Sequence, residues 1–506
     1  MASNKKNPSA IVIGAGMTGI QMVVKLKQAG INDVTLLEKK DKVGGTWREN
    51  TYPGVACDVP AHAYTYSFAP NPEWSGMFAP GAEIQQYFEK VFYDQGVDKH
   101  TRFNEGVVSS VYNDGQWTVT TTQGNTLVCD LLFAATGMLH KPVTPEFKGM
   151  SRFNGDVMHS AEWKQDVNLQ GKKIGVIGTG SSAAQLIPEL INRNDSEVTV
   201  FQRTPQYLVK VDNKKYTEKQ KDKFRNSPKA MQRAKELALM VFEKGTTALT
   251  SEKWFDRQMH KLMAWNARHY LKTAVKDPEL RAKLTPDYKF GCKRVVMNAS
   301  FYPAIQKANA TLITDGIDTF EETGIRTQDG TLHELDVIVC ATGFDPVAYM
   351  RPMDFKGRDG VDINDVWATK VQAYRSMMIP QFPNFFLLLG PNSPIGNYSV
   401  IAMSEKQADY ALEIVSAWRQ EQIETIEAKP EALKSWNQEL RQKMGRTVWA
   451  SGCNSWYLDA DGDPLTWPDT WKAWLAAMEK PVFTDFYTSE PITAQKLVEG
   501  EIEEMA

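Results

Sequence analysis

Short apolar runs alternate along this chain with amphipathic stretches and glycine-rich turns. The first run, residues 10–13, is apolar throughout, as expected of a strand buried on both faces of a parallel sheet. Apolar positions recur at helical spacing over residues 20–26, Gly30 can end that helix, and residues 34–37 form a second apolar run. This order of strand, helix and strand predicts a βαβ unit and therefore an α/β fold.

A second unit of the same kind starts at residue 173. Residues 173–177 and 198–201 are apolar runs, and a glycine turn and a helical stretch separate them. An internal repeat supports two units, because residues 130–137 and 336–343 each form an apolar strand that runs into Ala-Thr-Gly. The sequence therefore predicts two Rossmann-like dinucleotide-binding domains of the α/β class.

We expect the chain to enter the second domain and then to return to the first. Residues 1–145 are predicted to form the first part of one domain, residues 146–339 the other domain, and residues 340–506 the returning part with a C-terminal tail. Within the second domain, residues of about 213–288 are charged and carry apolar residues at helical spacing, namely Leu237, Met240, Val241, Leu262 and Trp265. This pattern predicts a helical insertion with one solvated and one packed face.

Smaller elements follow from the same pattern. Alternating positions predict two antiparallel strands, residues 107–111 and 117–121, around a turn at Asp114. Farther on, the pattern predicts a buried strand, a loop and a helix at residues 385–390, 391–398 and 404–419.

Gly14, Gly16 and Gly19 form a G-x-G-x-x-G turn directly after the first strand. The first glycine allows the tight turn, the second lets the backbone approach a pyrophosphate, and the third lets the helix pack on the strand. Glu38 follows the second strand, where a carboxylate suits a ribose 2′-hydroxyl and repels a 2′-phosphate. We therefore expect FAD or NAD at this site, and not NADP.

The second turn differs from the first in the charge that follows it. It runs Gly178-Thr179-Gly180-Ser181-Ser182-Ala183, a G-x-G-x-x-A variant. Arg203 stands where Glu38 stood in the first unit, and an arginine there can bind a 2′-phosphate with two donors. This second site is therefore expected to prefer NADP, and the alternative is that Arg203 is a solvated surface charge.

Composition and charge narrow the class of protein. The 506 residues carry a formal net charge of -3, which gives no support to nucleic-acid binding. Because there is no run of about 18 apolar residues and the first nine residues are polar, we expect no membrane span and a cytoplasmic location. The cysteines lack C-x-x-C spacing, so we expect no metal site among them and no disulfide-reductase chemistry. All five are expected to be free thiols, namely Cys57, Cys129, Cys292, Cys340 and Cys453.

Two further motifs follow the first βαβ unit. Gly45, Thr46 and Trp47 combine glycine with a large aromatic residue, which can wall a flat ring system. Tyr-Pro-Gly at residues 52–54 precedes Asp58, which by itself would be interpreted as a solvated loop carboxylate. Neither motif is specific when taken alone.

The most specific pattern lies between the two predicted domains, where Phe153, Gly155, His159 and Trp163 fit F-x-G-x-x-x-H-x-x-x-W. With the motifs above, this fingerprint makes the chain resemble the class B flavin monooxygenases, and most closely the type I Baeyer–Villiger monooxygenases. The resemblance covers nearly the whole chain and includes residues 201–205, Lys293-Arg294 and residues 341–345. One departure is Lys164, because the Baeyer–Villiger fingerprint continues with Pro or Asp and N- and S-oxygenating flavin monooxygenases usually carry Lys.

The resemblance implies FAD and NADP(H) as cofactors and a small hydrophobic ketone with O₂ as substrates. In that family NADPH reduces FAD, the flavin adds O₂ to form a C4a-peroxyflavin, and the peroxide converts the ketone to an ester or lactone. By the same resemblance, Arg294 stabilises the negative charge that develops, and Asp58 pairs with Arg294 and holds it in position. Lys293, Arg203 and Thr204 match the contacts to the NADP 2′-phosphate.

The resemblance also assigns residues to the neighbourhood of FAD, namely Thr46, Trp47, Asp58, Tyr64, Val107 and Val400. His159 is expected to organise the linker between the domains rather than to transfer protons.

We predict Baeyer–Villiger oxidation of a ketone, with two alternatives. An N- or S-oxygenating flavin monooxygenase is favoured by Lys164 and disfavoured by Trp163, Arg294 and Asp58. A nucleotide-binding scaffold without turnover would have little need for Arg294 or Asp58. The sequence predicts neither the particular ketone nor the oligomeric state.

Overall fold

A five-stranded parallel sheet forms the centre of the first domain in the computed structural model, which describes residues 7–193, 195–393, 398–420, 425–453 and 455–488. The strand order is β19-β7-β1-β2-β3, and every neighbouring pair is parallel. Its strands are β1 (Ala10–Ile13), β2 (Val34–Leu37), β3 (Thr101–Arg102), β7 (Leu131–Ala134) and β19 (Phe385–Leu387). The strands predicted at residues 10–13 and 34–37 are confirmed, and the strand predicted at 385–390 ends three residues earlier.

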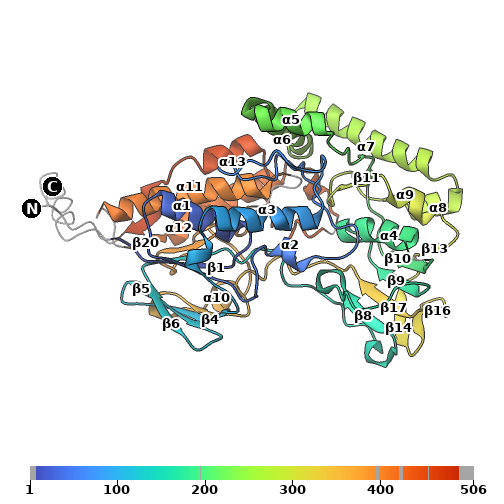
Figure 1. Cartoon of the computed structure of the whole chain (residues 1–506), viewed down its shortest axis with the longest axis horizontal. Helices are drawn as coiled ribbons and strands as arrows, with labels where there is room; N and C mark the ends of the chain where they lie inside the picture. The colour runs from blue at the N-terminus through green and yellow to red at the C-terminus, as the bar shows by residue number, and fades with distance from the viewer. Residues whose placement is uncertain (1–6, 194, 394–397, 421–424, 454, 489–506) are drawn as a thin grey trace, which may run out of the picture.

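The second sheet repeats this arrangement beside the first (Figure 1). Its order is β13-β10-β9-β17-β8, again with parallel neighbours. The strands are β8 (Asp156–His159), β9 (Lys173–Ile177), β10 (Glu197–Phe201), β13 (Ala310–Ile313) and β17 (Val337–Cys340). In each sheet the strand before the glycine turn pairs with the strand before Ala-Thr-Gly, so the internal repeat contributes one strand to each sheet.

Two smaller sheets flank these units. One of them contains three antiparallel strands, β4 (Val107–Asn113), β5 (Gln116–Thr121) and β6 (Thr126–Cys129), and β18 (Asp354–Lys356) pairs with β4 at its edge. The predicted turn at Asp114 is confirmed, since Asp114 and Gly115 both have a positive φ. The second domain carries β14 (Ile317–Glu321), β15 (Gly324–Thr327) and β16 (Leu332–Glu334), and two short pairs join β11 (Leu208–Val209) to β12 (Val296–Met297) and β20 (Ile426–Ala428) to β21 (Phe486–Thr488).

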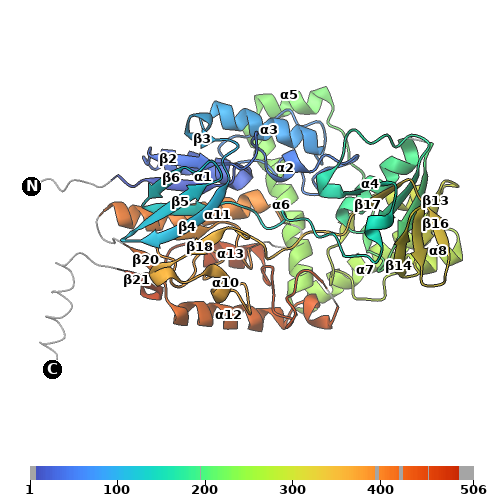
Figure 2. The same ribbon diagram turned by 90° about the horizontal axis from the view of Figure 1, so that it is seen from below.

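Helices cover the sheets and fill the space between them (Figures 1 and 2). Those of the first domain and the tail are α1 (Met17–Gln28), α2 (Thr46–Glu49), α3 (Gly81–Asp94), α10 (Ile363–Val366), α11 (Val400–Arg419), α12 (Pro430–Met444) and α13 (Trp471–Ala477). Those of the second domain are α4 (Ser181–Arg193), α5 (Glu218–Asn226), α6 (Pro228–Thr250), α7 (Trp254–Ala274), α8 (Pro278–Lys283) and α9 (Phe301–Ile305). The helix predicted at 404–419 begins four residues earlier, and residues 394–397 of the predicted loop lie outside the described residues.

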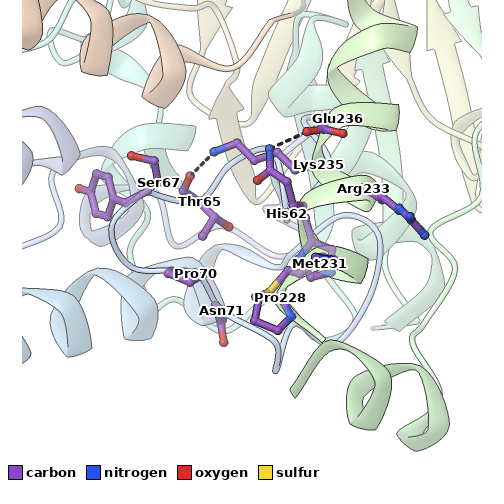
Figure 3. A pocket seen from close by; sticks show the side chains of 13 residues that line it. His62, Thr65, Ser67, Pro70, Asn71, Pro228, Met231, Arg233, Lys235 and Glu236 are labelled. Carbon is purple, nitrogen blue, oxygen red and sulfur yellow. Dashed lines mark hydrogen bonds between the residues drawn. The ribbon is translucent and has the colours of Figure 1, made fainter. Parts of the chain in front are cut away.

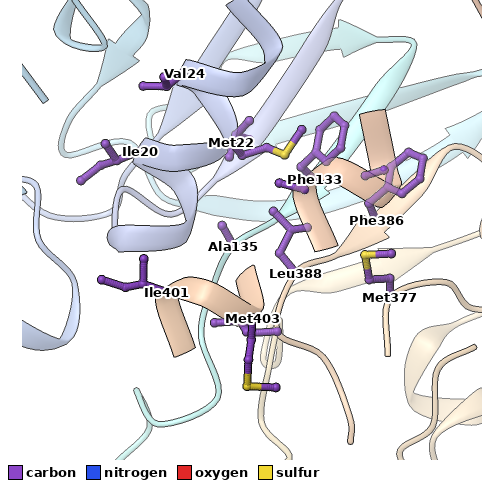
Figure 4. Packing of buried hydrophobic residues seen from close by; sticks show 14 of the residues in the cluster. Ile20, Met22, Val24, Phe133, Ala135, Met377, Phe386, Leu388, Ile401 and Met403 are labelled. Atoms are coloured by element: carbon purple, nitrogen blue, oxygen red, sulfur yellow. The ribbon is translucent and has the colours of Figure 1, made fainter. Parts of the chain in front are cut away.

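The core of the first domain forms where α1 and α11 pack against the first sheet (Figure 4). Met22 of α1 and Met403 of α11 are fully buried, as are the stacked rings of Phe133 and Phe386 on neighbouring strands, whose centroids lie 5.0 Å apart. This packing brings the returning part of the chain, after residue 340, onto the sheet that the N-terminal part builds. The exact boundaries between residues 145 and 146 and between residues 339 and 340 stay predictions.

The predicted helical insertion is present as α5 to α8. Its packed face is not where the spacing suggested, because Leu237, Met240, Val241, Leu262 and Trp265 are all exposed. The inward faces of α6 and α7 are formed by other residues, among them Ala248, Leu249, Ala267, Tyr270 and Leu271. The expectation of a single packed face at the selected positions is therefore wrong, since both helices carry two apolar faces.

In the part of the chain that the structure describes, none of the helices combines the length and the apolar character that a membrane span requires. Nor does any group of three or more His, Cys, Asp or Glu side chains among those residues come together in a way that could hold a metal ion.

Candidate active site

The first glycine turn is formed by contacts that leave no room for side chains. Gly14 has a φ of +100°, and a Cβ atom there would lie 2.8 Å from the backbone oxygen of Ala135. A Cβ on Gly19 would lie 1.9 Å from the oxygen of Gly14, so only glycine lets α1 pack this closely. No side chain caps the start of α1, which leaves its first N–H groups available to an anion.

Glu38 is buried at the tip of β2 and braces this turn. Its Oε2 accepts a hydrogen bond from the N–H of Ala15 at 2.7 Å, and its Oε1 accepts one from the N–H of Lys40 at 3.0 Å. A carboxylate has about four acceptor positions, so both oxygens can also accept from ribose hydroxyl groups. The side chain is therefore held where the predicted nucleotide would need it.

The residues predicted to wall a flat ring system lie beside the start of α1. Gly45 faces Gly16, since a Cβ on Gly45 would lie 3.0 Å from the Cα of Gly16. Trp47 donates from Nε1 to the hydroxyl of Tyr64 at 3.0 Å, and that hydroxyl lies 3.5 Å from Sδ of Met17. Thr46 is exposed at the first position of α2. The structure thus brings Gly45, Trp47 and Tyr64 together at the first glycine turn.

Val107 and Val400 lie at two other places in the first domain. Val107 begins β4 and is buried in the apolar cluster that also contains Ile13 at the end of β1. Val400 begins α11, where Ser399 caps the helix and donates from its hydroxyl to the oxygen of Ala63 at 2.7 Å. Both residues belong to the first domain, and nothing else in their contacts assigns them a role.

The second glycine turn repeats the contacts of the first. Gly178 has a φ of +110°, and a Cβ atom there would lie 2.5 Å from the backbone oxygen of Ala341, the counterpart of Ala135. A Cβ on Gly180 would meet nothing within 4 Å, so this glycine borders open space. The hydroxyl of Thr179 donates to the oxygen of Thr204 at 3.0 Å and joins the turn to the segment after β10. Ser181, Ser182 and Ala183 form the first turn of α4.

The Tyr-Pro-Gly segment of the first domain packs directly on α4 of the second. The hydroxyl of Tyr52 donates to Oε1 of Gln185 at 3.0 Å, and Nε2 of Gln185 donates to the oxygen of Ala56 at 2.9 Å. Gly54 has a φ of +82°, and a Cβ there would lie 2.8 Å from the oxygen of Gln185. These contacts hold the segment that leads to Asp58 against the second domain.

Asp58 and Arg294 form an ion pair between the two domains. Nη2 of Arg294 donates to Oδ1 of Asp58 at 2.7 Å and to Oδ2 at 2.6 Å. The side chains are 19% and 28% exposed respectively, so this is a half-buried pair and not the solvated loop carboxylate that Asp58 alone suggested. Asp58 raises the pKa of Arg294 above its ordinary value, so the guanidinium stays protonated.

The guanidinium keeps donors that the carboxylate does not use. Nε of Arg294 is buried and has no hydrogen-bond partner among the described residues. Tyr457 of the C-terminal tail is buried nearby; burial raises its pKa to about 12, and the charge of Arg294 opposes that rise. A fixed cation beside a neutral phenol can stabilise a negative charge that develops next to them.

A cavity of about 820 Å³ opens beside the segment after β10. Among the described residues, four basic side chains and one acidic side chain line it, namely Arg203, Lys283, Lys289, Lys293 and Asp287. Burial and the nearby charge of Arg203 lower the pKa of Lys293, so the two predicted phosphate contacts act on each other although 90 positions separate them. An excess of cations in one cavity suits a phosphate group.

The fingerprint spans the edge strand β8, and among its four residues only His159 lies within that strand. β8 pairs with β17 in register from Asp156 to His159, in the place that β19 takes in the first sheet. Gly155 is needed because a Cβ would lie 2.1 Å from the oxygen of Asp336 and 2.6 Å from the ring of Phe153. Trp163 packs partly buried against the core of the second domain.

His159 ends this edge strand and faces the second Ala-Thr-Gly segment. Its Nδ1 accepts from the N–H of Ala161 at 3.1 Å, and its ring lies edge-on to Phe344 at 5.9 Å. Burial lowers its pKa, so the ring is held neutral. These contacts agree with a positioning role where the chain passes from one domain to the other.

Lys164, the departure from the fingerprint, lies on the surface. Its Nζ is 3.8 Å from Oδ1 of Asp156, and both side chains are about half exposed. An exposed ion pair of this kind contributes little stability. Its contacts give Lys164 no connection to the Asp58–Arg294 pair.

The expectation of five free thiols is wrong for two of them. Cys292 and Cys453 form a disulfide, and Cys57, Cys129 and Cys340 are free and buried. The bond ties residue 292, two positions before Arg294, to a loop of the tail that lines the basic cavity. Sequence spacing could not reveal the pair, because 161 positions separate the two cysteines.

A second cavity, of about 520 Å³, lies between residues 62–71 and α6 (Figure 3). Nζ of Lys235 donates to the oxygen of Thr65 at 3.5 Å across it. Burial lowers the pKa of His62 to about 4, so its imidazole is neutral. None of the residues predicted for the site lines this cavity.

Sequence reasoning missed several residues that the structure brings to the site. They are Gln185, Lys283, Lys289, Cys453 and Tyr457. The lysines belong to a segment rich in basic residues, and nothing in their spacing distinguishes them. Tyr457 follows Trp449 and Trp456 and precedes Trp467, and this aromatic-rich stretch near the end of the sequence is a signal that points to it.

Comparison with known proteins agrees with this arrangement. The pyridine nucleotide-disulphide oxidoreductase family matches residues 11–253. An uncharacterised monooxygenase of Mycobacterium tuberculosis is 44% identical over 91% of this chain and 92% of that protein. A Baeyer–Villiger monooxygenase of Streptomyces coelicolor is 36% identical over 96% of this chain and 93% of that protein.

Solved structures extend the likeness to the whole fold. Cyclohexanone monooxygenase from Rhodococcus sp. Phi1, solved with NADP⁺, is 29% identical and has a TM-score of 0.84 over 96% of this chain and 99% of that chain. The protein OTEMO, solved in complex with FAD and NADP, is 28% identical and has a TM-score of 0.85 over 96% of this chain and 100% of that chain. The two parallel sheets, the two glycine turns and these relatives together show that the chain belongs to the family of the Baeyer–Villiger monooxygenases.

Proposed function

We propose that this chain is an FAD-dependent monooxygenase that uses NADPH and O₂ to convert a ketone to an ester or lactone. The observation that carries the proposal is the Asp58–Arg294 ion pair, which joins the two nucleotide-binding domains. A small hydrophobic ketone is the proposed substrate, and the cytoplasm is the proposed location. The substrate follows from the resemblance and from the name of one relative, cyclohexanone monooxygenase, and the location follows from the sequence alone.

The first glycine turn fits FAD. The start of α1 has no side-chain cap, so its N–H groups suit a pyrophosphate. Gly14, Gly16 and Gly45 line the same turn, where a Cβ atom on any of them would contact the neighbouring backbone. Glu38 would accept hydrogen bonds from the ribose. The hydroxyl of Thr136, buried in the first Ala-Thr-Gly segment without a partner among the described residues, offers a further polar group. When bound, FAD that NADPH has reduced supplies the oxygen-activating chemistry.

The second turn and the basic cavity fit NADP. The start of α4 would hold the pyrophosphate, and Arg203, Lys293 and Thr204 would hold the 2′-phosphate. Lys283 and Lys289 line the same cavity and add to its positive potential. Preference for NADPH over NADH would then come from charge and not from shape.

Arg294 is proposed to stabilise the negative charge that develops on the substrate oxygen. Arginine suits this role because it stays protonated where a buried lysine can lose its proton. Asp58 would fix the guanidinium through Nη2 and leave Nε, which has no described partner, free to donate to the reacting groups. Burial raises the pKa of Tyr457 to about 12, so its hydroxyl keeps its proton near neutral pH and would offer a second donor there.

The heteroatom-oxygenating alternative depended on Lys164. Because Lys164 is half exposed and paired with Asp156, its contacts offer that alternative no support. A nucleotide-binding scaffold without turnover gives no reason for an ion pair between the domains. We therefore favour ketone oxidation.

The test combines flavin content, coenzyme use and product identity. The purified protein should be yellow and release FAD, and it should oxidise NADPH faster when a suitable ketone is added. Under ¹⁸O₂, mass spectrometry of a ketone panel should find an ester or lactone that carries one ¹⁸O atom. A colourless protein that takes up no FAD, or a flavoprotein that yields only sulfoxides or N-oxides, would overturn the proposal.

A further inference from the structure

The α6–α7 hairpin, defined here as residues 228–274, concentrates the exposed apolar surface of the protein. In the described part of the chain, seven of the fourteen exposed large apolar side chains lie on it. Leu237, Met240 and Val241 are on α6 and are 51% to 61% exposed. Trp254, Phe255, Leu262 and Trp265 are on α7 and are 55% to 74% exposed. So large an apolar surface on one hairpin indicates a binding surface.

These side chains are not the outer edge of a core, because both helices already pack through other faces. α6 buries Ala248 and Leu249, and its Leu239 and Phe242 pack on the core of the first domain. α7 buries Ala267, Tyr270 and Leu271 in the second domain. A helix that is apolar on two sides is usually covered on both of them.

The same hairpin is strongly basic. Eight of its basic residues are exposed and only two of its acidic residues, Glu236 and Glu252, are exposed. Of its other two acidic residues, Glu243 accepts from the N–H of Trp471 at 2.9 Å and Asp256 is half-buried. Because the whole chain has a formal net charge of -3, this positive surface is local to the hairpin.

Basic and apolar residues alternate along α7. Lys253, Arg257, Lys261 and Arg268 are exposed between or beside Trp254, Leu262 and Trp265. Tryptophan and lysine prefer the boundary between water and lipid, where the ring is buried and the ammonium group reaches the headgroups. Helices that lie on membranes combine these residues in the same way.

We propose that the α6–α7 hairpin binds the surface of a membrane that contains anionic lipid. The helices would lie on the surface, with their apolar side chains among the upper acyl chains, and would not span it, in line with the lack of a membrane-spanning helix among the described residues. The proposal does not rest on the oxidation of ketones. Where both hold, the enzyme would take an apolar substrate from the phase in which that substrate concentrates.

Charge argues against a second copy as the occupant of this surface. In a two-fold interface the same face meets itself, so eight exposed basic residues would approach eight others. Shape argues against a peptide, because none of the seven side chains lines either of the two cavities described above. An anionic lipid surface needs neither a groove nor an exact fit.

The test measures sedimentation of the full-length, FAD-loaded protein with vesicles. One set contains equal parts of phosphatidylglycerol and phosphatidylcholine, and the other contains phosphatidylcholine alone. We expect binding to the anionic set that weakens as salt is added, and at least tenfold weaker binding to the neutral set.

Variants separate the two contributions. Trp254→Ser with Trp265→Ser should lower the partition coefficient on the order of tenfold, because the buried aromatic area is lost. Lys253→Gln and Lys261→Gln should each lower it roughly fivefold on anionic vesicles only. The matched control is Tyr93→Ser with Val128→Ser, which removes side chains of 63% and 53% exposure elsewhere and should change nothing. Circular dichroism should be unchanged in every variant, since all of these side chains are exposed.

Several results would overturn the inference. They are absence of binding to anionic vesicles, equal binding to neutral vesicles, or equal losses in the tryptophan variant and in its control. A dimer found by light scattering without lipid, and lost in the Trp254→Ser, Trp265→Ser variant, would assign the surface to a second copy instead.

Discussion

Nη2 of Arg294 lies 2.7 Å and 2.6 Å from the two carboxylate oxygens of Asp58, although 236 positions separate the two residues. Asp58 belongs to a segment that Tyr52 and Gln185 hold against α4, and Arg294 follows a cysteine that is bonded to the C-terminal tail. Three parts of the chain therefore determine the position of one guanidinium. Substitution of Arg294 removes the cation, and substitution of Asp58 removes the group that orients it, so the two roles can be tested separately.

Arg294→Ala should abolish most ketone oxidation while leaving the cofactors bound. One preorganised electrostatic group is worth on the order of 10²- to 10³-fold in rate, so ester formation should fall by about that factor. NADPH should still be consumed, with hydrogen peroxide as the product, and this is measured by comparing NADPH oxidation with ester yield. Arg152→Ala, which removes an exposed arginine, serves as the control. Ester formation near the parental rate in Arg294→Ala would disprove the assignment.

Asp58→Asn should have the same effect in a milder form. The amide keeps the size of the side chain but loses its charge, so it orients Arg294 less firmly. Arginine stays protonated even without the carboxylate. Misplacement of a catalytic group costs roughly 10- to 100-fold, and the loss should appear in kcat for ester formation more than in KM for NADPH. A loss larger than that of Arg294→Ala would show that Asp58 takes part in the reaction directly.

Arg203→Ala should weaken NADPH binding and spare NADH. A charge-assisted contact contributes about 1.5 to 3 kcal/mol, and the low end applies because Arg203 is exposed, so KM for NADPH should rise roughly tenfold. Arg193→Ala, at the far end of α4, is the matched control because Arg193 pairs with Glu189 on the surface. Equal losses for NADPH and NADH would exclude Arg203 as the phosphate contact.

Local signals in the sequence predicted the strands and turns of both nucleotide sites. β1, β2 and the two glycine turns depend on neighbours within a few residues, and an apolar run that ends in glycines allows few other structures. The role of Asp58 came only from resemblance, because a lone loop carboxylate carries no signal until its partner is known. The structure supplies that partner from the other domain.

Two kinds of feature could not be predicted from the sequence, namely which face of a helix packs inward and which residues far apart in the sequence pair with each other. Both faces of α6 and α7 are apolar, so spacing predicted helices without telling which face packs inward. The pairing of β8, which ends at His159, with β17 has no signal in the sequence, because the paired residues lie about 180 positions apart. For the same reason, spacing rules for nearby cysteines could not reveal the Cys292–Cys453 bond.

Lys293 should make NADPH binding sensitive to alkaline pH. Burial and the charge of Arg203 lower its pKa in the free protein, and a bound phosphate dianion favours the protonated form. The affinity for NADPH should therefore be highest below the pKa that Lys293 has in the free protein, and it should fall as the pH rises through that pKa. The fall should occur at a lower pH than for an ordinary lysine. KM for NADPH measured against pH should show this rise, and KM for NADH should not. Lys293→Arg should remove the alkaline rise, because arginine stays protonated; a rise of the same size in that variant would contradict the assignment.

Reduction of the Cys292–Cys453 disulfide should destabilise the tail of the protein. The bond closes a loop across 161 positions, and losing a cross-link of that kind typically costs about 2 to 4 kcal/mol. Before reduction, a thiol assay of the denatured protein should count three free thiols out of five cysteines. Cys453→Ser should unfold at a lower temperature than the parent, and the parent should approach the variant when a reductant is added.

The internal control is that reductant leaves the unfolding temperature of Cys453→Ser unchanged, because its other cysteines are already free. Since the bond joins the loop at Cys453 to the residue before Lys293, its loss should also raise KM for NADPH more than KM for NADH. Five reactive thiols in the untreated, denatured protein would show that the bond does not form.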